Sequence, residues 1–196
     1  MAKADLQQSS GSVRIIGGKW RSRNLHFVSV NGLRPTGARI RETLFNWLAS
    51  SIEGARCLDL FAGSGALCFE ALSRGAEHAI AIENNSLAIS NLRLNQEKLK
   101  ADNLEIIADD CRHLLKLKNS QQPFDLVFLD PPFEMKLHKE VSDLLVSKNW
   151  LGFRSQIYCE LPATEPQDLP LSWRLIKDKT AGNVRYCLFE YIEQTA

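Results

Sequence analysis

The sequence has no apolar run longer than a β-strand, so it offers no segment that could cross a bilayer as a helix of about 20 residues. Its five cysteines are an odd number, are widely spaced and form no Cys-x-x-Cys pair. This spacing argues against disulfide bonds and zinc ligation and predicts small buried thiols. The four histidines are also scattered, so no metal site is expected. The N-terminus lacks the charged-then-apolar layout of a signal peptide, and we expect a cytoplasmic protein.

Acidic residues are scarce at the N-terminal end of the chain. Residues 1–41 contain eight Lys or Arg residues and one Asp, whereas residues 42–196 contain 16 Lys or Arg residues and 22 Asp or Glu residues. This asymmetry favours a polyanionic partner for the N-terminal end. A solvated basic arm without any partner would have the same composition, so charge alone leaves both interpretations open.

Apolar strand-like runs alternate with helical patterns from residue 56 onward. Strands are predicted at 56–60, 77–83, 104–108, 124–130, 155–161, 173–178 and 184–191, and helices at 65–74, 86–100, 110–118 and 136–147. Such alternation predicts right-handed crossovers and an α/β fold with a mostly parallel, seven-stranded sheet covered by helices on both faces. The last two strands are joined by residues 180–183 alone, which predicts a hairpin and one antiparallel strand near the edge of the sheet.

A short β-hairpin is expected before this alternation. Val13 to Ile16 is predicted to form a strand, Gly17-Gly18 a turn, and the segment from Lys19 to Phe27 the returning strand. We therefore divide the chain into a basic tail and hairpin extension at residues 1–31 and a main domain at residues 32–196. Thr36 is a good N-cap for a helix that runs from Arg39 to Leu48.

The hairpin and the segment after it combine basic and aromatic side chains. Such a ribbon suits the phosphates and stacked bases of a nucleic acid. Each aromatic side chain could equally cap a small apolar cluster of the protein itself. The candidate RNA-binding residues are Arg14, Lys19, Trp20, Arg21, Arg23, Arg34 and Arg39.

The stretch from Cys57 to Leu67 is the centre of the predicted domain. A buried strand ends in Asp59, two glycines follow at Gly63 and Gly65, and a helical pattern begins. Glycines permit a tight turn that exposes backbone N–H groups to a ligand at the helix N-terminus. Cys68 stands where the dinucleotide fingerprint requires its third glycine, so the pattern alone is weak and also fits a plain strand-to-helix turn.

The next strand ends in an acidic residue at the spacing that a nucleotide site requires. Glu83 lies 18 residues after Gly65, directly after an apolar run. A carboxylate at this position can bind the two hydroxyl groups of a ribose.

The stretch from Phe124 to Phe133 carries the predicted chemistry. A buried strand delivers Asp130 to the same carboxyl edge as Asp59, and two prolines and Phe133 follow. Prolines stiffen the backbone and remove donors, which leaves carbonyl groups free to accept hydrogen bonds. Asp130 and the Pro131 carbonyl can together hold both hydrogens of an exocyclic amine, and Phe133 can stack on its base. The same residues could instead be a rigid loop after a strand.

These motifs resemble those of class I S-adenosylmethionine-dependent methyltransferases, with a Rossmann-like fold. Asp59 to Gly65 resembles their first motif, Glu83 their ribose-binding acid, and Asp130 to Phe133 their amino-methylation motif. More narrowly, the segments 14–18, 33–36, 41–48 and 61–65 together resemble the bacterial 16S ribosomal RNA guanine-N2 methyltransferases of the D type. The resemblance extends from about residue 13 to the C-terminal strands.

The resemblance implies S-adenosylmethionine as the methyl donor and a guanine of 16S rRNA, free or in an assembling small subunit, as the acceptor. It implies that the adenine of the donor lies near Asp110 and the Cys111 N–H, although Asp109 or Asp110 is also expected to cap a helix. The implied catalytic residues are Asp130, Pro131, Pro132 and Phe133. The implied cofactor-binding residues are Asp59, Phe61, Ala62, Gly63, Ser64, Gly65, Glu83, Asn84, Asp109, Asp110 and Cys111.

Three alternatives remain at this stage. An adenine-N6 methyltransferase of DNA or RNA shares the Asp-Pro-Pro-Phe motif, and a nucleotide-dependent oxidoreductase shares the glycine turn, although the missing third glycine disfavours it. A non-catalytic RNA-binding assembly factor could retain the fold, but intact Asp59, Glu83 and Asp130 argue against it. No self-pairing element stands out in the sequence, so a monomer is expected.

Overall fold

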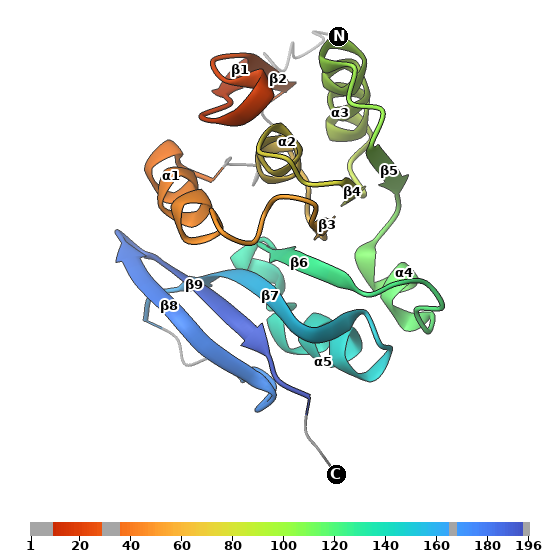
Figure 1. Cartoon of the computed structure of the whole chain (residues 1–196), viewed down its shortest axis with the longest axis vertical. Helices are drawn as coiled ribbons and strands as arrows, with labels where there is room; N and C mark the ends of the chain where they lie inside the picture. The colour runs from red at the N-terminus through yellow and green to blue at the C-terminus, as the bar shows by residue number, and fades with distance from the viewer. Residues whose placement is uncertain (1–9, 29–35, 165–167, 194–196) are drawn as a thin grey trace, which may run out of the picture.

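The computed structural model describes residues 10–28, 36–164 and 168–193 (Figure 1). The strands are β1 (Ser10–Arg14), β2 (Asn24–Val28), β3 (Arg56–Asp59), β4 (His78–Glu83), β5 (Leu104–Ala108), β6 (Phe124–Leu129), β7 (Leu151–Pro162), β8 (Trp173–Ala181) and β9 (Val184–Tyr191). The α-helices are α1 (Ala38–Trp47), α2 (Ala66–Ser73), α3 (Ser86–Leu99), α4 (Cys111–Lys116) and α5 (His138–Ser147), and the 3-10 helices are η1 (Gly18–Trp20) and η2 (Phe133–Met135). No helix within these ranges is both long and apolar enough to span a bilayer.

The main sheet has seven strands in the order β5-β4-β3-β6-β7-β9-β8. The pairs from β5 to β7 are parallel, and β9 is antiparallel to both of its neighbours. The strand order reverses between β3 and β6, which opens a crevice at the carboxyl ends of these strands. The predicted sheet is therefore confirmed, including its one antiparallel strand next to the edge.

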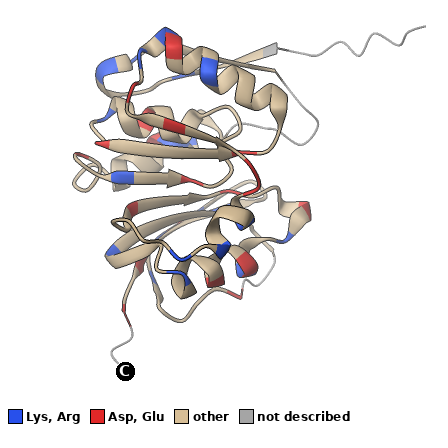
Figure 2. Cartoon of the chain, turned by 90° about the vertical axis from the view of Figure 1, so that its right-hand side faces the viewer, with Lys and Arg blue, Asp and Glu red and all other residues tan. Residues whose placement is uncertain are grey.

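Two apolar clusters sandwich the sheet, because alternate residues of each strand face opposite sides. One cluster joins α1, α2 and α3 to one face, and the other joins α4 and α5 to the opposite face. All five cysteines are buried free thiols, as expected from their spacing. In Figure 2 the positions of Lys, Arg, Asp and Glu lie on helices, on loops and on some of the strands, with uncharged ribbon between them.

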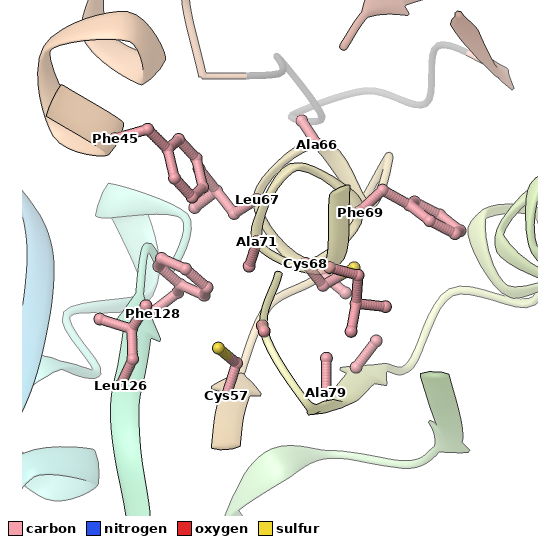
Figure 3. Packing of buried hydrophobic residues seen from close by; sticks show 14 of the residues in the cluster. Phe45, Cys57, Ala66, Leu67, Cys68, Phe69, Ala71, Ala79, Leu126 and Phe128 are labelled. Carbon is pink, nitrogen blue, oxygen red and sulfur yellow. The ribbon is translucent and has the colours of Figure 1, made fainter. Parts of the chain in front are cut away.

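Helix α2 is buried on every side, with all eight of its residues inside the protein. In Figure 3 Leu67 and Ala71 face Phe45 and Phe128, whereas Phe69 points to the other side of the helix. The outer side of α2 is covered by the N-terminal segment, since Val13, Ile15 and Leu25 belong to the same core cluster. The extension is therefore part of the main core. The expected boundary at residue 31 lies outside the described residues.

The N-terminal hairpin differs from the expected one in its turn. β1 and β2 pair antiparallel, but the returning strand begins at Asn24, and η1 occupies part of the connection. Gly17 and Gly18 are therefore not a two-residue turn. Gly18 has a φ of +76°, and a Cβ there would lie 1.7 Å from the Ser73 carbonyl oxygen. The glycine pair was predicted wrongly because its role is close backbone contact with α2, which no local pattern encodes.

A buried carboxylate holds the extension on α2. The Glu70 side chain is fully buried and accepts hydrogen bonds from the backbone N–H groups of Ile16 and Gly17, at 2.8 Å each. It also forms an ion pair with Arg74 at 2.7 Å. Because a buried carboxylate is stable only when it is paired and hydrogen-bonded, these partners fix the segment in place.

Candidate functional site

A cleft of about 1080 Å³ lies at the carboxyl edge of the parallel strands. Its walls come from the loops that follow β3, β4, β5 and β6, from the end of β7, from the start of α1 and from the β8–β9 turn. The cleft is lined by all four predicted catalytic residues and, with the exception of Gly65, by every predicted cofactor-binding residue. The strand order brings these residues together although the set spans more than 70 positions of the sequence, from Asp59 to Phe133.

The glycine turn after β3 has the backbone that the sequence predicted. Gly65 caps α2 with a φ of +77°, a conformation that glycine adopts without strain. A Cβ at this position would lie within 2.7 Å of the Phe69 and Leu92 side chains. Gly65 therefore packs against the protein interior and does not line the cleft. Phe61, Gly63 and their neighbours do line it.

Asp59 lies at the end of β3 and is almost completely buried. Burial raises the pKa of its carboxyl group to about 7, hydrogen bonds from the backbone N–H groups of Phe61 and Cys68 oppose this shift, and the charge of Glu83 adds to it. The Oδ2 atom has no hydrogen-bond partner among the described residues, although it is buried at the edge of the cleft. A buried acceptor without a donor is costly, and a cationic ligand would satisfy it.

Glu83, the last residue of β4, forms hydrogen bonds with the loops that follow β3 and β4. Its Oε2 accepts a hydrogen bond from the Gly63 N–H at 2.8 Å. Its Oε1 accepts from the N–H groups of Asn84 and Asn85, at 2.9 and 2.8 Å. These three donors hold the carboxylate in one orientation beside the glycine turn. Oε1 already accepts two of the hydrogen bonds, so the remaining lone pair for a ligand hydroxyl group is on Oε2.

Asp110 is the N-cap of α4, as expected for one of the two aspartates. Its side chain accepts from the Arg112 N–H and forms an ion pair with the Arg112 guanidinium at 2.6 Å. This contact is the main reason that the pKa of Asp110 falls to about 2. Asp109 binds His113 at 2.8 Å instead. The Cys111 N–H belongs to the first turn of α4, where backbone donors have no acceptor within the helix.

Asp130 follows β6 directly and is half-buried at the cleft. The Thr36 hydroxyl donates a hydrogen bond to its Oδ2 at 3.2 Å. Burial and the nearby Glu160 carboxylate raise the pKa of Asp130, and the Thr36 hydrogen bond opposes the shift. Pro131 and Pro132 turn the chain into η2, which places Phe133 on the cleft wall.

Three residues at this site were missed or misassigned from the sequence. Thr36 was expected to cap α1, but Gly37 is the N-cap and the Thr36 hydroxyl binds Asp130. Arg41, counted from the sequence among the basic residues of the N-terminal end, is buried and donates to the carbonyl groups of Thr36 and Arg14. Glu160, which lines the cleft beside Asp130, carried no signal because it lies within an apolar strand.

The predicted RNA-binding residues do not form one cluster. Arg39 lies in the first turn of α1, close to cleft residues Gly37 and Ile40. Arg14 is exposed on β1. Arg34 lies outside the described residues.

The remaining four RNA-binding candidates lie in the β1–β2 connection, at the end of the molecule away from the cleft. The Trp20 N–H binds Ser73 at the end of α2, and Arg23 reaches the Lys98 carbonyl at the end of α3. Lys19 and Arg21 are exposed there. The Trp20 ring is half-buried against the core and packs edge-on against Phe69, with 6.4 Å between ring centroids.

The strand order, the reversal between β3 and β6 and the antiparallel β9 define the fold of class I methyltransferases. An RNA methyltransferase from Salinibacter ruber, solved in complex with S-adenosyl-L-homocysteine, shares this fold with a TM-score of 0.63 at 16% identity over 83% of this chain and 97% of its own. Residues 13–190 match the family model described as conserved hypothetical protein 95, and the chain belongs to this family.

The named relatives agree with the methyltransferase resemblance. Ribosomal RNA small subunit methyltransferase D of Haemophilus influenzae is 43% identical over 97% of this chain and 100% of its own length. The protein of the same name from Escherichia coli K12 is 44% identical over 96% of this chain and 94% of its own. The structure of the putative methyltransferase yhhF from E. coli has a TM-score of 0.86 at 42% identity, over 94% of this chain and 100% of its own.

Proposed function

We propose that the chain transfers a methyl group from S-adenosylmethionine to the exocyclic N2 of a guanine in small-subunit ribosomal RNA. The observation that carries this proposal is the shared cleft, which holds Asp59 and Glu83 on one side and Asp130 with its two prolines on another. The names of the relatives supply the substrate class, because two of them are small-subunit rRNA methyltransferases that cover the chain nearly end to end. An rRNA substrate would place the reaction in the cytoplasm.

The donor-side residues fit S-adenosylmethionine. The unpartnered Asp59 Oδ2 suits an ammonium group, which a methionine moiety supplies. The Glu83 carboxylate, fixed by three backbone N–H groups, keeps one unused lone pair on Oε2 for a ribose hydroxyl, and a second hydroxyl would have to share Oε1 with a backbone donor. The Cys111 N–H can donate to a ring nitrogen of the adenine. Because the Asp110 side chain already caps α4 and binds Arg112, it would have to share these contacts to hold the adenine amine.

The acceptor-side residues orient a nucleophile that is weak on its own. The bound donor supplies an electrophilic methyl group on a sulfonium, which needs no acid catalyst. The lone pair of a guanine N2 is delocalised into the ring, so hydrogen bonds from the amine to Asp130 and to the Pro131 carbonyl would direct it. Alignment of this kind lowers a barrier by up to about 7–11 kcal/mol. Asp130, or solvent beyond it, then accepts the surplus proton. Burial and the Glu160 charge raise the pKa of Asp130, which favours this role.

The target base must leave its surroundings in the RNA to enter the cleft, which costs a few kcal/mol. Contacts between phosphates and basic side chains of the N-terminal segment would offset this cost. Arg39 lies near the cleft and suits contact with the target nucleotide, whereas Lys19, Arg21 and Arg23 suit a more distant part of the RNA.

The direct test is methyl transfer from labelled S-adenosylmethionine to protein-free 16S rRNA and to partly assembled small subunits. The product is digested to nucleosides and analysed by mass spectrometry. We expect N2-methylguanosine at one position, and the comparison of the two substrates identifies the assembly state that the enzyme accepts. N6-methyladenosine would instead support the adenine alternative. RNA binding without any methyl transfer to either substrate would support an assembly factor.

A further inference from the structure

A second carboxylate lies beside Asp130 in the cleft. Leu129 of β6 pairs with Cys159 of β7 in a parallel register, so Asp130 and Glu160 occupy the next position of neighbouring strands. Paired positions of parallel strands point to the same face, and their backbones are about 5 Å apart. Glu160 is 6% exposed and lines the same cleft as Asp130.

Hydrogen bonds hold this pair in position. The Tyr158 hydroxyl donates to the Glu160 Oε1 at 2.8 Å. The Thr36 hydroxyl binds the Asp130 Oδ2 and also favours the ionised form of Glu160 through hydrogen bonding. Because one hydroxyl has one hydrogen, it cannot satisfy both carboxylates at once. The pair therefore keeps acceptor capacity that is directed into the cleft.

The two purines differ in what they offer to such a pair. Guanine presents two neighbouring donors, the N1–H and the N2 amine, whereas adenine presents its N6 amine beside an N1 lone pair. Two adjacent acceptors match the edge of guanine and leave the N1 lone pair of adenine facing a carboxylate. A site that is built to accept a hydrogen bond discriminates strongly against an analogue that lacks the donor.

We propose that Glu160 accepts a hydrogen bond from the N1–H of the target guanine while Asp130 holds its N2 amine, so that Glu160 selects guanine over adenine. This inference rests on the proposed guanine methylation. It assigns the choice of base to β7, outside the Asp-Pro-Pro-Phe motif that guanine-N2 and adenine-N6 enzymes share.

The electrostatics of the pair agree with this assignment. Burial raises the pKa of Asp130 and of Glu160, and the Glu160 charge raises that of Asp130 further, so two ionised carboxylates are costly here without a ligand. Two N–H donors from one base would offset that cost. Adenine would offset only half of it and would add repulsion at its N1.

The experiment uses synthetic RNA in which the methylated guanine, once mapped, is replaced by 2-aminopurine. This base keeps the exocyclic amine at C2 but has a lone pair in place of the N1–H. For the wild-type protein we expect kcat/KM to fall about 10- to 100-fold with 2-aminopurine. In Glu160→Gln the amide nitrogen can donate to the N1 lone pair of 2-aminopurine. For this variant we therefore expect the ratio of kcat/KM with guanine to kcat/KM with 2-aminopurine to be at least tenfold smaller than for wild type.

The ratio of the two substrates within one variant separates base reading from any loss of folded protein. Comparing this ratio between wild type and variant also cancels the missing O6 of 2-aminopurine, because its loss affects both proteins alike. Glu190→Gln on the adjacent strand β9 is the matched control, since it neutralises another buried glutamate whose partners are Arg154 and Arg174. The control should keep the wild-type ratio.

Two results overturn the proposal without touching the proposed function. Wild-type protein that methylates guanine and 2-aminopurine equally well has no N1–H contact. A Glu160→Gln variant that keeps the wild-type ratio shows that Asp130 reads both donors by itself or that Glu160 has only a structural role. If the wild-type protein produces no methylguanosine at all, the proposed function fails, and the inference fails with it.

Discussion

The buried Asp59 carboxylate lowers the stability of the folded protein but is suited to bind a ligand. Its pKa of about 7 is higher than that of an unfolded aspartate, so the folded protein binds a proton that the unfolded chain releases between about pH 4 and 7. The contribution of this residue to stability is therefore present at low pH and is lost as the pH rises through 7. A group that is kept at such a cost, with one oxygen unpartnered, is typical of a ligand site.

Replacing Asp59 by Asn should expose this trade-off. At pH 8 the ligand-free variant should be more stable than wild type by about 1–3 kcal/mol, because the buried charge is gone. The gain should shrink toward pH 4, where wild-type Asp59 is protonated. Urea unfolding at several pH values measures the difference, and calorimetry should show donor binding weakened about tenfold or more. A stability difference that does not vary with pH would contradict the assignment.

Replacing Asp130 by Asn should separate binding from chemistry. The substitution keeps the shape and the contact to Thr36 but removes the proton acceptor, so kcat should fall about 10²- to 10⁴-fold. Affinity for S-adenosylmethionine, measured by calorimetry, should stay near wild type. Asp125→Asn is the control, because Asp125 precedes the same catalytic segment on β6 but binds the Arg56 N–H far from the cleft. Unchanged turnover in Asp130→Asn would refute the catalytic role.

The site residues that could be predicted from the sequence are those marked by a local pattern, an acidic residue at the end of an apolar run. Asp59, Glu83 and Asp130 each end an apolar run, so their meeting at one sheet edge follows from the parallel fold. Thr36 and Glu160 could not be found in this way. The role of each depends on a partner from a distant segment, and the local pattern around each has an ordinary structural explanation.

At the scale of elements, the helices and strands of the main domain were predicted closely, but the N-terminal extension was not. The parallel sheet could be predicted because apolar strands and helical patterns alternate regularly along the chain. The position of the extension depends instead on contacts between segments about 50 residues apart, such as the hydrogen bond from Ile16 to Glu70. Tertiary packing of this kind has no period. The wrong turn at Gly17-Gly18 follows directly from that.

Gly18→Ala tests the contact between the extension and α2. The Cβ would collide with the Ser73 backbone, and the φ of +76° disfavours alanine, so we expect a loss of about 2–4 kcal/mol in unfolding free energy. Gly182→Ala in the β8–β9 turn has a similar φ of +60° but nothing within 4 Å of the added atom. It should cost only about 1–2 kcal/mol. Equal losses in the two variants would show that backbone strain, not contact with α2, explains the glycine.

At the scale of the whole molecule, the extension links two ends of the protein. The cleft lies at the N-terminal end of α2, and the loop with Lys19, Arg21 and Arg23 lies at the other end. Eight helical residues span about 12 Å, so an RNA that touches both places must extend over several nucleotides. The loop would then contribute to affinity for the RNA and not to the methyl-transfer step in the cleft.

Replacing Lys19, Arg21 and Arg23 together by Gln should therefore weaken rRNA binding and reduce the slope of log K against log salt by about 2. At saturating RNA, kcat should remain near wild type, because no lining residue of the cleft changes. The matched control replaces Lys116, Lys118 and Lys177, which are equally exposed but lie on α4, just after it and on β8. If both triple variants lose the same affinity, general positive charge attracts the RNA and the loop is not its docking surface. If only the loop variant loses affinity, the RNA passes over the N-terminal segment that covers α2 on its way to Asp130.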